Sequence, residues 1–139
     1  MCGFQAAGAA PIVEGRPIAD PQTIATAIRI GNPASWQGAT AAVAQSHGLI
    51  ESVTDAEILA AYALAARLEG LFAEPASAAP LAGLLRMGRR GLIPKGSLVT
   101  LTLTGHGLKD PDTAMDQSKV EAPVVEARLE AVLKSLAFS

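Results

Sequence analysis

A strand pattern that runs directly into a capped helix is the feature of this sequence that most constrains its fold. Residues 49–53 read LIESV, a short apolar run that favours a strand. Thr54 and Glu57 follow with the spacing of a capping box, which marks the start of a helix. The next apolar residues share one helical face: Ile58, Leu59, Tyr62, Ala65 and Ala66. Gly70 is a suitable residue to end that helix.

The same scheme repeats further along the chain. We expect a brief strand over 71–73, a turn at Glu74 and Pro75, a helix from about Ser77 to Arg90, and a strand over 98–104. Shorter helices are predicted over 23–28 and from Ser35 to about Ser46, and a final amphipathic helix over 125–136. Strands and helices that alternate with short connections are typical of an α/β fold with a mostly parallel sheet and flanking helices.

The predicted strands are few and short, so we expect this sheet to be part of a larger one. The chain opens with CGFQAAGAAPIV, which has no polar lead-in. We interpret these residues as the end of a strand and a turn that belong to a unit beginning upstream.

Charge and hydropathy exclude several classes of protein. The formal net charge is −2 and the pI about 5.6, whereas nucleic-acid binding requires clustered cations. The densest basic run, Arg86 with Arg89 and Arg90, falls near a predicted helix end, where cations interact favourably with the helix dipole. No apolar run approaches the ~20 residues needed to span a bilayer, and the N-terminus lacks the basic region of a signal peptide. A single cysteine, Cys2, fits a reducing compartment, and we expect a cytoplasmic protein.

The strand predicted over 98–104 ends on a candidate ligand contact. Its alternation places Leu98, Thr100, Thr102 and Thr104 on one face. Thr104 is the last of this row, and Gly105 and Gly107 leave room for a flat ligand to approach the backbone. Ligands of open α/β sheets bind at the carboxyl ends of the strands. The alternative is a threonine that merely ends a β-favourable run.

Glu74 is the second candidate, because it follows the predicted strand 71–73 and neighbouring strands deliver their next residues to one place. Its carboxylate would equally complement the start of the next helix. His106 is expected to be a turn residue beside the glycines. His47, His106 and Cys2 show no metal-binding spacing, and the sequence contains neither a glycine-rich phosphate loop nor a GxSxG motif. We therefore predict no metal site within this chain.

Four blocks in this order carry a resemblance to a known family: GFQAAGAAPIV, IRIGNPASWQGA, FAEPASAAPLAG and TGHGLKDPDTA. Together they resemble the C-terminal part of bacterial threonine synthases, which are pyridoxal-phosphate enzymes of fold type II. The last block is also similar to a turn of the tryptophan synthase beta chain. The resemblance implies that residues 1–139 are the C-terminal part of a single α/β domain, with a helical tail over 120–139.

The resemblance also implies roles for individual residues. The Thr104 hydroxyl would hydrogen-bond the pyridine nitrogen of pyridoxal phosphate, with Gly105 and Glu74 near the same ring. A neutral hydroxyl, unlike an aspartate, does not stabilise a pyridinium, so the ring is a moderated electron sink. Ala27 would offer backbone groups to the substrate. Arg29 would anchor a phosphate or carboxylate, although a surface salt bridge explains it equally well.

The implied reaction converts O-phospho-L-homoserine and water to L-threonine and phosphate, in an enzyme that is a homodimer. It requires a Schiff-base lysine and an anion loop. The lysines present are Lys95, Lys109, Lys119 and Lys134, and none has a setting that resembles the family's Schiff-base motif. We therefore expect an inactive segment that needs the missing N-terminal part of the enzyme. The alternatives are a segment of another fold type II enzyme, similar to threonine dehydratase, and a non-catalytic binding or interaction module.

Overall fold

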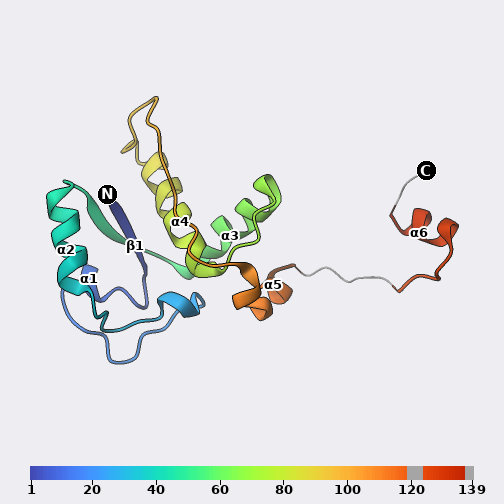
Figure 1. The fold of residues 1–139 in the computed structure, drawn as a ribbon, viewed down its shortest axis with the longest axis horizontal. Coiled ribbons are helices and arrows are strands. Elements are labelled where there is room, and N and C mark those ends of the chain that lie inside the picture. Colours follow the sequence, from blue (N-terminus) through green and yellow to red (C-terminus); the bar gives the residue numbers. More distant parts are fainter. Residues whose placement is uncertain (119–123, 137–139) are drawn as a thin grey trace.

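The computed structural model of this chain describes residues 1–118 and 124–136 (Figure 1). Its strands are β1 (Cys2–Ala6) and β2 (Leu49–Val53). Its α-helices are α1 (Pro11–Glu14), α2 (Trp36–Gln45), α3 (Asp55–Glu69), α4 (Pro75–Arg89), α5 (Pro111–Ser118) and α6 (Leu129–Ser135). Two short 3-10 helices complete the set, η1 (Thr26–Ile28) and η2 (Gly107–Lys109).

The two strands pair in parallel, with Cys2 opposite Leu49 and Ala6 opposite Val53. The chain between them forms α1, η1 and α2, because parallel neighbours require a long crossover. The strand expected over 49–53 is confirmed with the same bounds, and the first residues are a strand followed by a turn, as predicted.

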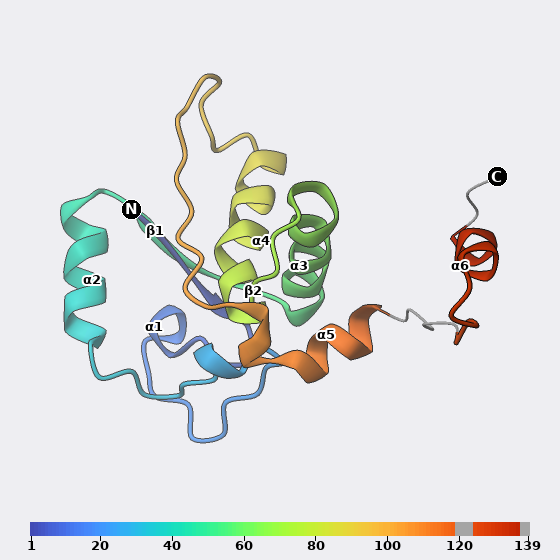
Figure 2. The same ribbon diagram turned by 45° about the vertical axis from the view of Figure 1, so that its right-hand side comes forward.

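Helices lie on both sides of this sheet. α2 lies on one side, and α3 and α4 lie together on the other (Figures 1 and 2). α4 packs on both strands and along α3. A side chain at Gly83 of α4 would prevent this approach, because a Cβ there would lie 2.3 Å from the Phe4 ring of β1. The core is correspondingly built from small residues of α4 against larger ones: Ala76, Ala79 and Ala82 with Val53, Ile58 and Tyr62.

The capping box and the terminal glycine predicted for the helix after β2 are both present in α3. The Thr54 hydroxyl accepts the Glu57 N–H, and the Glu57 carboxylate accepts the Thr54 N–H, which completes the capping box. Gly70 ends the helix in the left-handed conformation, with φ of 66°. α4 begins two residues before the expected Ser77, because Pro75 occupies its first turn, where proline's missing N–H costs nothing. α2 begins after Ser35, but the Ser35 side chain makes no capping hydrogen bond.

Two predicted strands are absent from the described residues. Residues 71–73 form a single antiparallel bridge, between Ala73 and His106, and residues 98–104 form no ladder. The alternation of the second segment still has a structural counterpart, since Leu98 is 96% exposed while Leu101 and Leu103 line an apolar groove of about 280 Å³ beside α3 and α4. A strand requires a hydrogen-bonding neighbour, and no described strand lies beside this segment.

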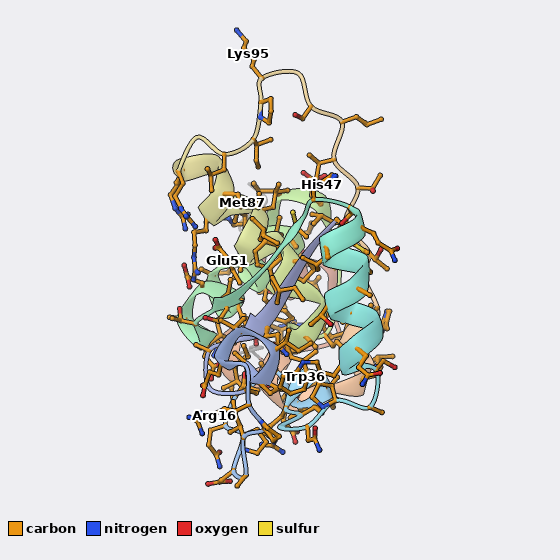
Figure 3. The ribbon with its side chains drawn as sticks, turned by 90° about the vertical axis from the view of Figure 1, so that its left-hand side faces the viewer. Arg16, Trp36, His47, Glu51, Met87 and Lys95 are labelled. Carbon is orange, nitrogen blue, oxygen red and sulfur yellow. The ribbon has the colours of Figure 1, made fainter. Side chains whose placement is uncertain are left out.

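Two loops and the last helix lie farthest from the sheet. Figure 3 shows Lys95 at the tip of the loop after α4 and Arg16 on a loop at the opposite end. The predicted C-terminal helix is present in shortened form as α6, which lies apart from the other elements in Figures 1 and 2. The predicted start of the tail at residue 120 lies outside the described residues.

Candidate functional site

The turn after residues 98–104 meets the start of α4 through backbone hydrogen bonds. The Glu74 N–H donates to the Gly105 carbonyl at 3.0 Å, and the Gly107 N–H donates to the Phe72 carbonyl at 3.0 Å. These bonds flank the antiparallel bridge of Ala73. Glu74 and Thr104 were expected to meet at the ends of two parallel strands; their segments do meet, but in antiparallel orientation.

Ser77, in the first turn of α4, joins the helix to the tip of this turn. Its hydroxyl accepts the Gly105 N–H at 2.9 Å. The same oxygen lies 3.2 Å from the Gly105 carbonyl and 3.3 Å from Thr104 Oγ1. Ser77 is 1% exposed, so these groups supply its hydrogen bonds in place of water. The sequence prediction missed this residue as a site component, although a hydroxyl among the small apolar residues of EPASAAP is the signal that marks it.

Glu74 is buried and paired with a lysine from the same turn. Its side chain is 4% exposed, and Lys109 Nζ donates to Glu74 Oε1 at 2.9 Å. A Cβ on Gly105 would lie 1.9 Å from Glu74 Oε1 and 2.8 Å from Lys109 Nζ. Glycine at position 105 therefore lets the ion pair close directly against the backbone.

His106 is a turn residue, as predicted. Its Nδ1 accepts the Leu108 N–H at 3.2 Å and caps η2. Its ring meets the Phe72 ring edge to face, with centroids 5.3 Å apart. Both contacts fix the turn in place.

An open hollow of about 310 Å³ lies over this junction, lined by residues 71–73 and 103–106. Phe72 and Leu103 supply apolar walls, and Thr104 is exposed and contributes a neutral hydroxyl. Such a combination of apolar surface and a few convergent polar groups is typical of small-molecule sites.

The turn is also linked electrostatically to α3. Burial raises the pKa of the Tyr62 hydroxyl, and the negative charge of Asp110 raises it further. Asp110 Oδ1 accepts the Thr113 N–H at 3.3 Å, at the start of α5. Its Oδ2 is buried and has no hydrogen-bond partner among the described residues.

Ala27 and Arg29, the two predicted substrate contacts, lie at η1. This helix packs against α4 and lies beside the 105–110 turn in Figures 1 and 2. Asp55, the first residue of α3, holds the chain before it: Asp55 Oδ1 accepts the Thr23 hydroxyl at 2.5 Å, and Oδ2 accepts the Ile24 N–H at 3.1 Å. Both Ala27 and Arg29 are exposed. Arg29 forms no ion pair with another described residue.

Two of the three arginines in the basic run near the end of α4 pair with carboxylates. Arg86 pairs with Glu57, which lowers the pKa of that carboxyl to about 2 and raises the pKa of Arg86. Arg90 Nη1 lies 2.9 Å from both carboxylate oxygens of Glu51. In the described part of the chain, no helix is long and apolar enough to cross a membrane, and no three potential metal ligands cluster.

Comparisons with known proteins agree with this architecture. The family model for pyridoxal-phosphate dependent enzymes matches residues 1–105, which include Glu74, Thr104 and Gly105. The threonine synthase of Mycobacterium leprae is 58% identical over 124 residues, which are 89% of this chain and 34% of that protein. The threonine synthase of Synechocystis is 52% identical over 139 residues, which are 99% of this chain and 36% of that protein. The chain thus spans about a third of the length of the curated relatives that it matches.

Comparison with a solved structure supports the fold assignment. The crystal structure of a threonine deaminase from T.th. aligns with a TM-score of 0.52 and 23% identity, over 68% of this chain and 35% of that chain. This likeness confirms the predicted fold class, an α/β fold with a parallel sheet of the fold type II kind. Because the family model covers well over half of its residues, this chain belongs to the pyridoxal-phosphate dependent enzymes.

Proposed function

We propose that this chain is the C-terminal segment of a threonine synthase, which converts O-phospho-L-homoserine and water to L-threonine and phosphate. The observation that carries the proposal is the exposed Thr104 hydroxyl in an apolar hollow, backed by Ser77 and by the Glu74–Lys109 pair. It is supported by the identity of 52–58% to curated proteins with that name.

The residues of the hollow fit a flat pyridine ring with one acceptor nitrogen. Phe72 and Leu103 offer apolar surface, and Gly105 presents no side chain. Thr104 supplies a hydroxyl that donates one hydrogen bond. The lysine of this turn, Lys109, is engaged by Glu74, so the group that meets the ring nitrogen is neutral.

Bound pyridoxal phosphate supplies an electron sink for bond changes at the carbons of an amino acid. Thr104 donates its hydroxyl proton in a hydrogen bond to the ring nitrogen and so favours the unprotonated ring. Glu74, which is buried and held by Lys109, would lie near the same ring. Ala27 offers backbone groups to the substrate, and the exposed Arg29 guanidinium takes up an anionic group.

The chain acts together with the N-terminal part of the enzyme, in a homodimer in the cytoplasm. That part supplies the Schiff-base lysine and the loop for the cofactor phosphate. Of the lysines in the described residues, Lys109 is bound to Glu74, Lys95 lies at the tip of the loop after α4 (Figure 3), and Lys134 lies in α6. The chain alone is therefore inactive.

A chimera tests this proposal. The chain replaces the matching 124 residues of the Mycobacterium leprae threonine synthase, and phosphate and threonine release from O-phospho-L-homoserine are measured with added pyridoxal phosphate. We expect turnover by the chimera and none by the 139-residue chain alone. Thr104→Val in the chimera removes the hydroxyl at nearly constant volume, and we expect a changed absorption spectrum of the bound cofactor and a lower kcat. Thr104→Ser is the matched control.

The remaining outcomes separate the alternatives. A chimera that deaminates L-threonine but does not use O-phospho-L-homoserine would indicate a dehydratase-like segment. A folded chimera that binds no pyridoxal phosphate would indicate a non-catalytic module. Turnover by the chain alone would contradict the proposed dependence on an N-terminal part.

A further inference from the structure

We infer that Ser77 is a positioning residue that directs the proton of the Thr104 hydroxyl into the hollow. The inference rests on the proposed function, because it concerns how Thr104 meets the ring nitrogen. It assigns to Ser77 a role beyond joining α4 to the turn, and it follows from counting donors and acceptors.

Ser77 has one hydroxyl proton to give. Its oxygen already accepts the Gly105 N–H at 2.9 Å, so the proton goes to the Gly105 carbonyl at 3.2 Å or to Thr104 Oγ1 at 3.3 Å. The Gly105 carbonyl already accepts the Glu74 N–H at 3.0 Å. Thr104 Oγ1 therefore accepts fewer hydrogen bonds than the Gly105 carbonyl and is the more available acceptor for the Ser77 proton.

The direction of this one proton decides what Thr104 can do. When Ser77 donates to Thr104, the Thr104 hydroxyl does not donate back to Ser77, so its own O–H bond points into the hollow. When Ser77 donates to the Gly105 carbonyl, Thr104 donates to Ser77 and presents only lone pairs to the hollow. An unprotonated ring nitrogen accepts hydrogen bonds only, so it selects the first arrangement.

The resulting chain runs in one direction, from the Gly105 N–H through Ser77 and Thr104 to the ring nitrogen. Hydrogen bonds in such a chain polarise and strengthen one another. Because Ser77 is 1% exposed, water does not replace it as the donor behind Thr104. The hydroxyl of Ser77 thereby helps to keep the ring nitrogen unprotonated.

The test uses the chimera described above, loaded with pyridoxal phosphate that carries ¹⁵N in the ring. The variants are Ser77→Ala, Thr104→Val and the double variant, with Thr104→Ser as the variant that retains a hydroxyl. The readouts are the ¹⁵N chemical shift of the ring, the cofactor absorption band and the Kd for pyridoxal phosphate. Urea unfolding of the apo chimera measures any structural effect separately.

We expect Ser77→Ala to move the ¹⁵N shift from the wild-type value toward that of Thr104→Val and to weaken cofactor binding by roughly tenfold or less. In the Thr104→Val background, Ser77→Ala should have no further effect on the shift. A purely structural Ser77 would lower stability equally in both backgrounds and leave the ¹⁵N shift of the single variant at the wild-type value, which would overturn the inference.

The possible failures are distinguishable. A wild-type chimera that binds no cofactor contradicts the proposed function. A Thr104→Val shift equal to wild type contradicts the contact between Thr104 and the ring nitrogen. A Thr104→Val effect without a Ser77→Ala effect contradicts only the role of Ser77.

Discussion

The β2–α3 region and residues 98–104 both carry clear sequence patterns. Only the first finds its structural partners within the described residues of this chain. β2 has a parallel neighbour, and the α3 cap binds Arg86 of α4. Residues 98–104 alternate as a strand does and yet form no ladder with a described strand. A local pattern therefore determines which side chains face inward, whereas a strand also requires a hydrogen-bonding neighbour from elsewhere in the sequence.

The two regions also use ion pairs differently. Glu57 and Arg86 are partly exposed at the surface between α3 and α4, with side-chain exposures of 27% and 25%. Glu74 is almost fully buried, while its partner Lys109 remains 56% exposed. The first pair joins two packed helices, and the second holds the turn whose residues line the hollow. The free energy of unfolding of the 139-residue chain, measured by urea titration of variants, separates the two contributions.

The largest effect is expected in the packed region. Ile58 is 0% exposed and lies in the core against α4, so Ile58→Ala should lower the free energy of unfolding by about 3 kcal/mol. Ile30 is 49% exposed, and Ile30→Ala is the matched control, with a change below about 0.5 kcal/mol. Equal losses in the two variants would mean that this core does not form in solution.

The next effect concerns the cap of α3. Glu57→Gln removes the charge that pairs with Arg86 and weakens the capping box, and should cost about 1.5 kcal/mol at about pH 7. The folded pKa of Glu57, about 2, lies below its ordinary value of 4.5. Its stabilisation is therefore fully present above pH 4.5 and is lost as the pH falls toward 2.

Urea titrations of wild type and Glu57→Gln from neutral pH down to about pH 2 should thus converge at the acidic end. Glu69→Gln, at the exposed end of the same helix, is the control and should change the free energy of unfolding by less than about 0.5 kcal/mol. A difference between wild type and Glu57→Gln that stays constant with pH would contradict the role of the ionised carboxylate.

These regions also show what the sequence could predict. Thr54 and Glu57 are three residues apart, so their capping box was visible in the sequence, and so were the bounds of β2. Arg86 reaches Glu57 from 29 residues away, and Ser77 reaches Gly105 from 28 residues away. No local periodicity encodes such pairings, because they depend on how α4 docks on its neighbours.

Sequence reasoning singled out some residues of the candidate site but did not identify Ser77, which joins them. Thr104, Gly105 and Glu74 were singled out from turn and strand signals, and the structure brings them together. The antiparallel bridge that joins their segments was not expected, since two parallel strands were predicted. A pattern of alternating residues carries no information on the direction of the neighbouring segment.

A smaller effect is expected at the turn over the hollow. Lys109→Met leaves the buried Glu74 carboxylate without its ion-pair partner and should cost about 1 kcal/mol, since the lysine itself is largely exposed. Lys109→Arg should retain most of the stability. Lys95→Met, at the loop tip seen in Figure 3, removes the same charge without a contact in the core and is the matched control. Equal effects of Lys109→Met and Lys95→Met would mean that the Glu74–Lys109 pair does not stabilise the turn.

The smallest effects are expected in the segment 98–104 itself, where two leucines report on its alternation. Leu98 is 96% exposed, and Leu98→Ser should change the free energy of unfolding by less than about 0.5 kcal/mol. Leu103 is 41% exposed and lines the apolar groove beside α3 and α4, so Leu103→Ser should cost up to about 1 kcal/mol. A larger loss at Leu98 than at Leu103 would show that the segment presents its other face to the molecule. Its strand-like alternation would then bury the threonine row, and Thr104 would not face the hollow.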